Sequence, residues 1–160
     1  MNDKIKFSLD DIFLPLIMFR LNPNFKPKDG KININSSIEV DYSLKDKSLS
    51  VNVQVEMPDE ENVPFSFMVV GVGKFTLSQE PQNDELEIIA QVNCAAMIYP
   101  YIREAVADLT RKAGVPPLHL QPVNFYSRLK HEKNKNDSTA VKNARIPKKR
   151  TKQLKVSKLD

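Results

Sequence analysis

The sequence is poor in the residues that build covalent, metal and catalytic sites. Its 160 residues include one cysteine, Cys94, so the chain can form no internal disulfide and no cysteine metal cage. Cys94 stands beside Ala95 and Ala96 and is predicted to be a buried small residue. His119 and His131 are the only histidines, and no acid and nucleophile accompany them. We therefore expect no enzyme activity, no catalytic residue, no metal site and no cofactor.

Long hydrophobic runs are also missing. No segment approaches the roughly 18 consecutive apolar residues that a membrane-spanning helix needs. The first residues, MNDKIKFSLDDIF, carry acids where a signal peptide has a basic region and an apolar stretch. We expect a soluble cytoplasmic protein that does not insert into membranes.

Charge is divided unevenly along the chain. Residues 128–160 contain 12 Lys and Arg against 3 acids, a net charge of +9, whereas residues 1–127 contain 12 basic and 17 acidic residues, a net charge of −5. We predict a folded domain of residues 1–130 and a basic tail of residues 131–160, disordered when unbound from about Asn134. Twelve cations could hold nucleic acid weakly, but the tail has no aromatic residue to stack on bases beyond Tyr126 near its root. A solvated tail without a nucleic-acid partner is favoured.

Two alternating segments predict an antiparallel hairpin. Apolar residues recur at even positions of KININSSIEVDYSL, from Ile32 to Leu44, and at odd positions of LSVNVQVEM, from Leu49 to Met57. The polar turn KDKS lies between them.

Two further segments are apolar on both faces. PFSFMVVGVGKFTL has apolar residues at both parities, and Gly71 and Gly73 within it are expected to permit a bulge or a close backbone approach. The earlier segment IKFSLDDIFLPLIMFR is predicted to place Phe7, Leu9 and Phe13 opposite Ile12, Leu14 and Leu16. A strand of this kind must cover both faces, by a helix layer and by a partner or ligand, and two of them in a small sheet indicate an oligomer.

A helical period follows the strands. Apolar residues from Ile98 to Leu109 recur at helical spacing, and Gly114 is a typical stop. Pro100 is expected to begin or kink this helix near Tyr99, with a shorter helix before it around residues 85–91. A last helix, FYSRLKHEK, follows Asn124 as its cap. The order predicts an α+β fold: a four-stranded antiparallel meander sheet, a long amphipathic helix, a proline-rich linker and a C-terminal helix.

The block NCAAMIYPYIREAVADLTRKAGVPPLHLQPVNF, residues 93–125, resembles the SecB protein-export chaperones. Its matching parts are the helix core YPYIRE at residues 99–104, the basic-Gly stop at residues 111–114 and the linker at residues 116–125. The segment FSFMVVGVGKFTL is similar to the fourth strand of that family, and the resemblance covers about residues 5–130.

The resemblance implies a SecB-like dimer of dimers in which helices lie between sheets. It also implies binding of unfolded or non-native polypeptides in apolar grooves beside the linker, without ATP. The implied client-binding residues are Phe65, Phe67, Met68, Val115, Leu118, Leu120 and Phe125. The implied oligomer interface contains Tyr101, Ile102 and Arg103. Residue patterns leave open which strand face lines the groove, and whether the linker leucines contact the client or only pack the linker onto the sheet.

The chain departs from the family at its docking surface for the translocase motor SecA. That surface is acidic in export members, through the first strand and a Leu-x-Glu in the fourth, whereas the matching positions here are Arg20, Ser66 and Met68. SecA is a possible partner, but the replaced acids argue against this docking. Two alternatives stay open: a dedicated SecB-like chaperone of a toxin–antitoxin system and, less favoured, a nucleic-acid or ribosome-binding module driven by the tail.

Overall fold

The computed structural model describes residues 4–27 and 34–143, and the side chains of these residues up to residue 135. Contacts between Cα atoms divide the chain into two units, Met1–Leu129 and Lys130–Asp160. The strands are β1 (Phe7–Leu21), β2 (Ser37–Lys45), β3 (Ser48–Met57) and β4 (Phe65–Leu77). The helical segments are α1 (Asn83–Ile88), the π-helical segment η1 (Ile89–Cys94), α2 (Ala95–Lys112) and α3 (Phe125–Asn143).

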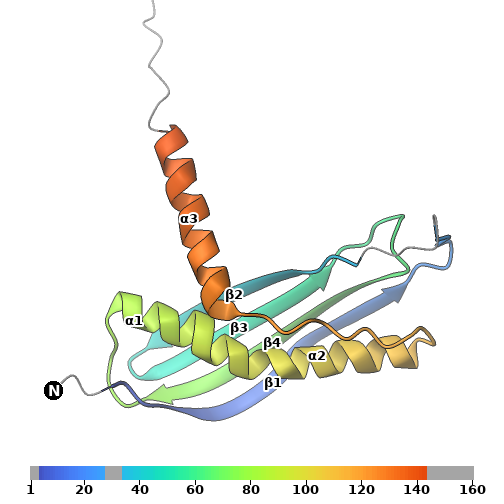
Figure 1. The fold of residues 1–160 in the computed structure, drawn as a ribbon. Coiled ribbons are helices and arrows are strands. Elements are labelled where there is room, and N and C mark those ends of the chain that lie inside the picture. The colour runs from blue at the N-terminus through green and yellow to red at the C-terminus, as the bar shows by residue number, and fades with distance from the viewer. Residues whose placement is uncertain (1–3, 28–33, 144–160) are drawn as a thin grey trace, which may run out of the picture. The chain divides into compact units, whose positions relative to one another are not determined.

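The four strands form one antiparallel sheet in the order β1-β4-β3-β2. The predicted hairpin is β2 and β3, with Lys45 opposite Ser48 and Asp46 at a φ of 55° in the turn between them. Strands β2 to β4 follow one another as a meander, and β1 pairs with β4, so β1 and β2 are the edge strands. Segments α1 and α2 lie across one face of this sheet (Figure 1). This is the predicted α+β fold.

The core of the first unit lies between this face and α2. Ile98, Ile102 and Val106 of α2 are fully buried. Because side chains alternate along a strand, the odd-numbered residues of β3 and β4 point toward the helix. The buried members of this set include Leu49, Val51, Val53, Val55, Phe65, Phe67, Val69 and Phe75.

Two glycines of β4 let α2 approach the sheet closely, as the sequence predicts. A Cβ atom at Gly71 would lie 2.7 Å from Cγ2 of Ile98, and one at Gly73 would lie 2.9 Å from Cδ1 of Ile98. Neither distance is possible for real carbon atoms in contact. The space that a side chain would take at Gly71 is filled by Ile98 and Ile102 of the helix. At Gly73 it is filled by Ile98 and by the ring of Phe75.

Strand β1 does not keep the alternation predicted for it. Its register against β4 shifts between Leu9 and Asp11 and again between Phe13 and Leu16, a stretch that contains Pro15. Each bulge adds one residue and reverses the parity of the strand. As a result Ile12 shares the helix-facing side with Leu9, whereas Phe13 lies on the outer face, contrary to the prediction.

The helical region is continuous through Pro100, where we expected a start or a kink. Pro100 lies inside α2, and the irregular segment is η1, where the N–H of Ala95 reaches the carbonyl of Ala90. Pro100 and Ala96 are both exposed. Proline deprives the carbonyl four residues earlier of its donor, and water can bond to that carbonyl on the solvent side of the helix.

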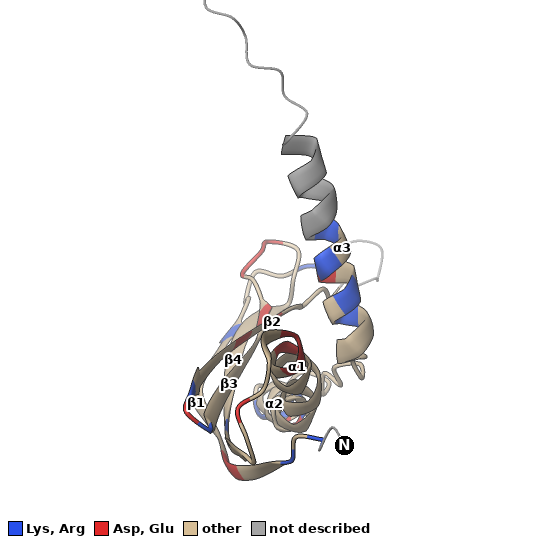
Figure 2. Ribbon diagram, turned by 90° about the vertical axis from the view of Figure 1, so that its left-hand side faces the viewer, with Lys and Arg blue, Asp and Glu red and all other residues tan. Residues whose placement is uncertain are grey.

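Helix α3 begins as predicted, because Oδ1 of Asn124 accepts a hydrogen bond from the N–H of Ser127 at 3.0 Å. It is longer than predicted and reaches Asn143. Lys and Arg residues recur along its described part (Figure 2). Residues 144–160 of the predicted basic tail lie outside the described residues.

We predict that Gly71→Ala lowers the free energy of unfolding by about 1 to 3 kcal/mol, because the added carbon overpacks the contact with Ile98. Urea denaturation measures this change. A second substitution, Ile98→Ala, removes the clashing carbon, so the double variant should cost less than the sum of the single variants. A Gly71→Ala protein as stable as the unaltered chain would contradict the close packing.

Candidate functional site

The linker between α2 and α3, residues 113–124, begins at a glycine-dependent helix end. Gly114 has a φ of +80°. Its N–H bonds the carbonyl of Arg111 at 3.1 Å, and the N–H of Val115 bonds the carbonyl of Thr110 at 3.2 Å. This pair of bonds is the Schellman arrangement, which reverses the chain immediately after the helix. The linker therefore returns along the helix it has just left.

Three side chains of α2 hold the linker by its backbone. Oγ1 of Thr110 accepts the N–H of Leu118 at 2.9 Å, and Nε of Arg103 donates to the carbonyl of Leu120 at 2.7 Å. The hydroxyl of Tyr99 donates to the carbonyl of Gln121 at 2.9 Å. We call Tyr99, Arg103 and Thr110 the linker clamp.

The clamp residues are set firmly in the helix. Thr110 is fully buried, and its hydroxyl lies 2.9 Å from the carbonyl of Val106, to which it can donate. Tyr99 also packs edge-on against Phe125, with ring centroids 5.6 Å apart. Burial raises the pKa of Tyr99, an effect that Arg103 partly opposes, so its hydroxyl stays protonated as the donor.

The prolines of the linker explain why side chains must hold it. Pro116, Pro117 and Pro122 have no backbone N–H and cannot take part in a strand ladder. The segment is extended and belongs to neither a strand nor a helix. Its attachment to α2 therefore depends on side-chain hydrogen bonds and on apolar packing.

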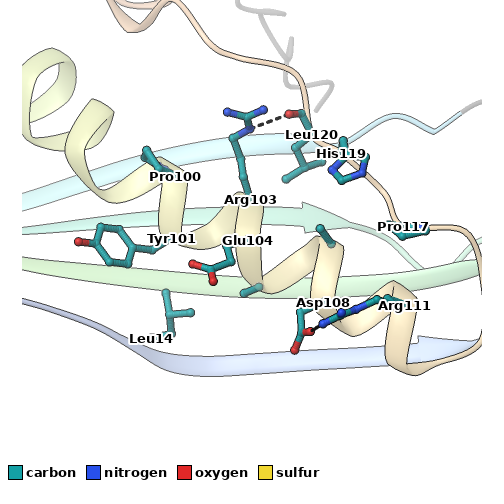
Figure 3. Close-up of a pocket in the computed structure, with 12 residues that line it drawn as sticks. Leu14, Pro100, Tyr101, Arg103, Glu104, Asp108, Arg111, Pro117, His119 and Leu120 are labelled. Carbon is teal, nitrogen blue, oxygen red and sulfur yellow. Dashed lines mark hydrogen bonds and ion pairs between the residues drawn. The ribbon is translucent and has the colours of Figure 1, made fainter.

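A cavity of about 750 Å³ opens between the linker, the exposed side of α2 and β1 (Figure 3). Leu14 enters it from β1, and Glu104 points toward Leu14. Hydrogen bonds from Lys112 and Arg111 hold the pKa of Asp108 below its usual value at one end. The lining residues are Leu14, Pro100, Tyr101, Arg103, Glu104, Ala105, Ala107, Asp108, Arg111, Pro117, His119 and Leu120.

The predicted client-binding residues divide into two groups in the structure. Phe65, Phe67, Leu120 and Phe125 are buried, with 3 to 5% of their surface exposed, whereas Met68, Val115 and Leu118 are half-buried. Leu118 and Leu120 both pack against the core, so linker packing accounts for them in the free chain. On β4, the odd-numbered phenylalanines face the helix and Met68 faces the opposite side. The sequence could not decide this because both parities are apolar.

The three residues expected at an oligomer interface point in different directions. Ile102 is fully buried in the core, Arg103 belongs to the clamp, and Tyr101 is 48% exposed beside the cavity. Consecutive helical residues turn by about 100°, so three in a row cannot share one face. The roles of Tyr99 and Thr110 could not be predicted from the sequence, because their partners are backbone atoms that no residue pattern reveals.

Strand β1 exposes an unusual amount of apolar surface. Six of its large apolar side chains are between 38 and 56% exposed: Leu9, Phe13, Leu16, Ile17, Met18 and Leu21. Phe13, Leu16 and Met18 lie opposite Val72, Val70 and Met68 of β4, on the face away from α2. We call these last six residues the outer apolar stripe.

The positions that the resemblance is expected to match with SecA-docking residues come together in the structure. Arg20, Ser66 and Met68 line a second cavity of about 480 Å³ at the end of the sheet. Arg20 and Ser66 are cross-strand partners, and a nitrogen of Arg20 lies 2.9 Å from Asp59 in an exposed ion pair. The local acid is thus neutralised by a cation of the same chain.

Neither a metal site nor a membrane helix is found in the described part of the chain. Within residues 4–27 and 34–135, no group of three His, Cys, Asp or Glu side chains could hold a metal ion. None of the described helices is long and apolar enough to cross a bilayer. Cys94 is buried as predicted, and burial raises the pKa of its thiol to about 12.

Comparisons with known proteins agree on one family. Residues 15–136 match the family model of SecB, the preprotein translocase subunit SecB. The protein-export protein SecB of Chromohalobacter salexigens is 30% identical over 151 residues, 89% of this chain and 90% of the relative. That of Aromatoleum aromaticum is 33% identical over 103 residues, 62% of this chain. The matches span 64% of the Aromatoleum relative and 60% of a Methylococcus capsulatus relative.

A solved structure shares the fold. It is the SecB-like chaperone Rv1957 of Mycobacterium tuberculosis in complex with a ChAD peptide from the Rv1956 HigA1 antitoxin. The two chains superpose with a TM-score of 0.60 at 20% identity, over 73% of this chain and 87% of the other. At this identity the likeness supports the α+β architecture alone.

We predict that the Cys94 thiol of the folded protein reacts with Ellman's reagent about a thousandfold more slowly at pH 8 than a free cysteine peptide. A pKa of about 12 leaves only a minute thiolate fraction at that pH. Absorbance of the released thiolate measures the rate. The same protein in guanidinium chloride should react at the rate of the peptide. Fast labelling without denaturant would contradict the burial of Cys94.

Proposed function

Because this chain belongs to the SecB family, we propose that it acts as an ATP-independent chaperone that binds non-native polypeptides on apolar surface. The outer apolar stripe, in which Phe13, Leu16 and Met18 are 38 to 56% exposed, is the observation that carries this proposal. Soluble monomers rarely expose a contiguous apolar patch of this kind, and such patches mark sites of protein interaction. The family resemblance predicted from the sequence is confirmed by the family model.

Apolar contact explains why such a chaperone would select unfolded chains. Burying one large apolar side chain contributes about 1.5 to 3 kcal/mol, whereas association costs on the order of 4 to 15 kcal/mol. Several contacts are therefore needed at once. Their number multiplies across subunits, and only a polypeptide without tertiary structure can reach them together.

We place client contacts on two surfaces of the domain. One is the outer apolar stripe, which contains Met68, and the other is the linker through the half-buried Val115 and Leu118. The other residues expected among the contacts support these surfaces from within the core: Phe65, Phe67, Leu120 and Phe125. The domain of residues 1–130 carries both surfaces, and we propose a cytoplasmic location.

We also propose the dimer of dimers implied by the family. Strand β1 is an edge strand, and an uncovered apolar edge tends to pair with another chain. A second copy paired there would cover the backbone edge of β1 while leaving the outer apolar stripe on the sheet face. Tyr101, 48% exposed on α2, is available for the contact between dimers.

The SecA partnership of export members is not part of this proposal. Arg20 stands where those members have an acid, and its pairing with Asp59 removes a further negative charge from the surface. Electrostatic complementarity to a basic docking segment is thereby lost. This observation favours a second candidate function, a dedicated SecB-like chaperone of a toxin–antitoxin system. The tail-driven nucleic-acid module gains no support from the described residues.

We predict that Met18→Asp weakens binding of fluorescently labelled, reduced and carboxymethylated α-lactalbumin by about three- to tenfold. Met18 is 56% exposed, so the change removes client contact at little cost to folding. Fluorescence anisotropy measures the affinity. Ser43→Asp, which puts the same charge on the same sheet face at β2, should leave it within about twofold. Equal affinity of Met18→Asp and the unaltered chain would remove the outer apolar stripe from the client surface.

We predict that purified SecA binds the unaltered chain at least about tenfold more weakly than the variant Arg20→Asp with Met68→Glu, which restores acids at the docking positions. Surface plasmon resonance at low and moderate salt measures both affinities. Ser43→Glu supplies a control charge on the same face and should not increase binding. Tight binding of SecA to the unaltered chain would refute the loss of docking.

A further inference from the structure

The linker clamp has no role in the proposed function so far, although it determines where the linker lies. Its three bonds fall within residues 118–121, on one amide and two carbonyls. The same stretch forms one wall of the 750 Å³ cavity through His119 and Leu120. Among the described residues, these are the only hydrogen bonds between α2 and residues 116–121. The clamp therefore fixes the position of this wall of the cavity.

The bonding pattern shows how the wall is fixed. Tyr99 and Arg103 lie one turn apart on one side of α2, and Thr110 lies about two turns further along the same side. From Thr110 back to Tyr99, their linker partners advance from Leu118 to Gln121. The linker thus runs antiparallel to the helix and is held at three positions along the helix axis. Pro116, Pro117 and Pro122 limit the backbone torsions between and beside these points. Little conformational freedom remains in the segment.

We infer that Tyr99, Arg103 and Thr110 are positioning residues for client binding, because they hold the linker as a preordered wall of the cavity. This inference rests on the proposed function. Thr110 is fully buried, and Tyr99 is 5% exposed, so neither side chain can offer a client appreciable surface. Their effect on affinity acts through the linker. A wall ordered in advance spares the client the entropy cost of ordering it on binding.

The chemistry of Thr110 permits an isosteric test. Thr110→Val keeps the shape of the side chain but removes the acceptor for the N–H of Leu118, whereas Thr110→Ser keeps that acceptor. One net hydrogen bond corresponds to a change of about two- to tenfold in an equilibrium constant. We expect Thr110→Val to speed hydrogen exchange at the Leu118 amide by that factor and to weaken binding of the labelled α-lactalbumin probe about threefold or more. Thr110→Ser should restore both values to within about twofold.

Tyr99→Phe is the second variant, because it removes only the hydroxyl that bonds Gln121 and keeps the ring against Phe125. Tyr99→Phe should also weaken probe binding, and it provides the test if Thr110→Val does not fold. Exchange at amides of the central strand β3 serves as the control for global stability and should not change.

The outcomes separate this inference from the proposed function. If the unaltered protein fails to bind the probe, the proposed function is wrong. If it binds, and Thr110→Val speeds hydrogen exchange at the Leu118 amide without lowering the affinity for the probe, the order of the linker does not contribute to client binding. The inference is then overturned. Unchanged exchange at Leu118 in both variants would overturn it as well, because the clamp would then not hold the linker.

Discussion

The close contact between α2 and β4 is the constraint on which the rest of the first unit depends. Without side chains at Gly71 and Gly73, Ile98 and Ile102 reach the backbone of the sheet. The helix can then bury one face of β3 and β4 completely. Because this single helix layer completes the core, the outer face of the sheet and the solvent side of α2 remain free for other contacts. Figure 2 shows α1 and α2 on one side of the sheet.

Those two leftover surfaces differ in character, which fits them for different tasks. The outer apolar stripe is continuous across β1 and β4 and includes the adaptable side chains Met18 and Met68. The cavity beside α2 mixes apolar residues with charged ones and is bounded by the linker. A chaperone that takes many sequences needs the first kind of surface. A defined wall, as in the second, can add affinity without adding a sequence code.

Much of the fold could be predicted, and the failures have identifiable physical causes. Period-two alternation located the β2–β3 hairpin, and the helical period with Gly114 located α2 and its end. The faces of β1 could not be predicted, because a bulge reverses parity without leaving a mark in hydrophobicity. The role of Phe65 and Phe67 was open for a related reason: β4 is apolar at both parities, and only the position of α2 selects the buried set. The clamp was invisible because Thr110 and Tyr99 bond to backbone atoms of distant residues.

The second bulge of β1 also limits how another chain could join the sheet. Pro15 lies within it and has no amide hydrogen to offer to either neighbour. Any strand added along β1 must therefore interrupt its hydrogen-bond ladder near the middle, dividing it into two short stretches. A partner strand has to pair with both stretches and be interrupted at the same place, so the proline restricts the register in which a strand can pair with β1. The edge of β1 is otherwise open and apolar, but a regular strand cannot pair along its whole length. A strand with a complementary irregularity, such as β1 of a second copy of the same chain, can still pair with it.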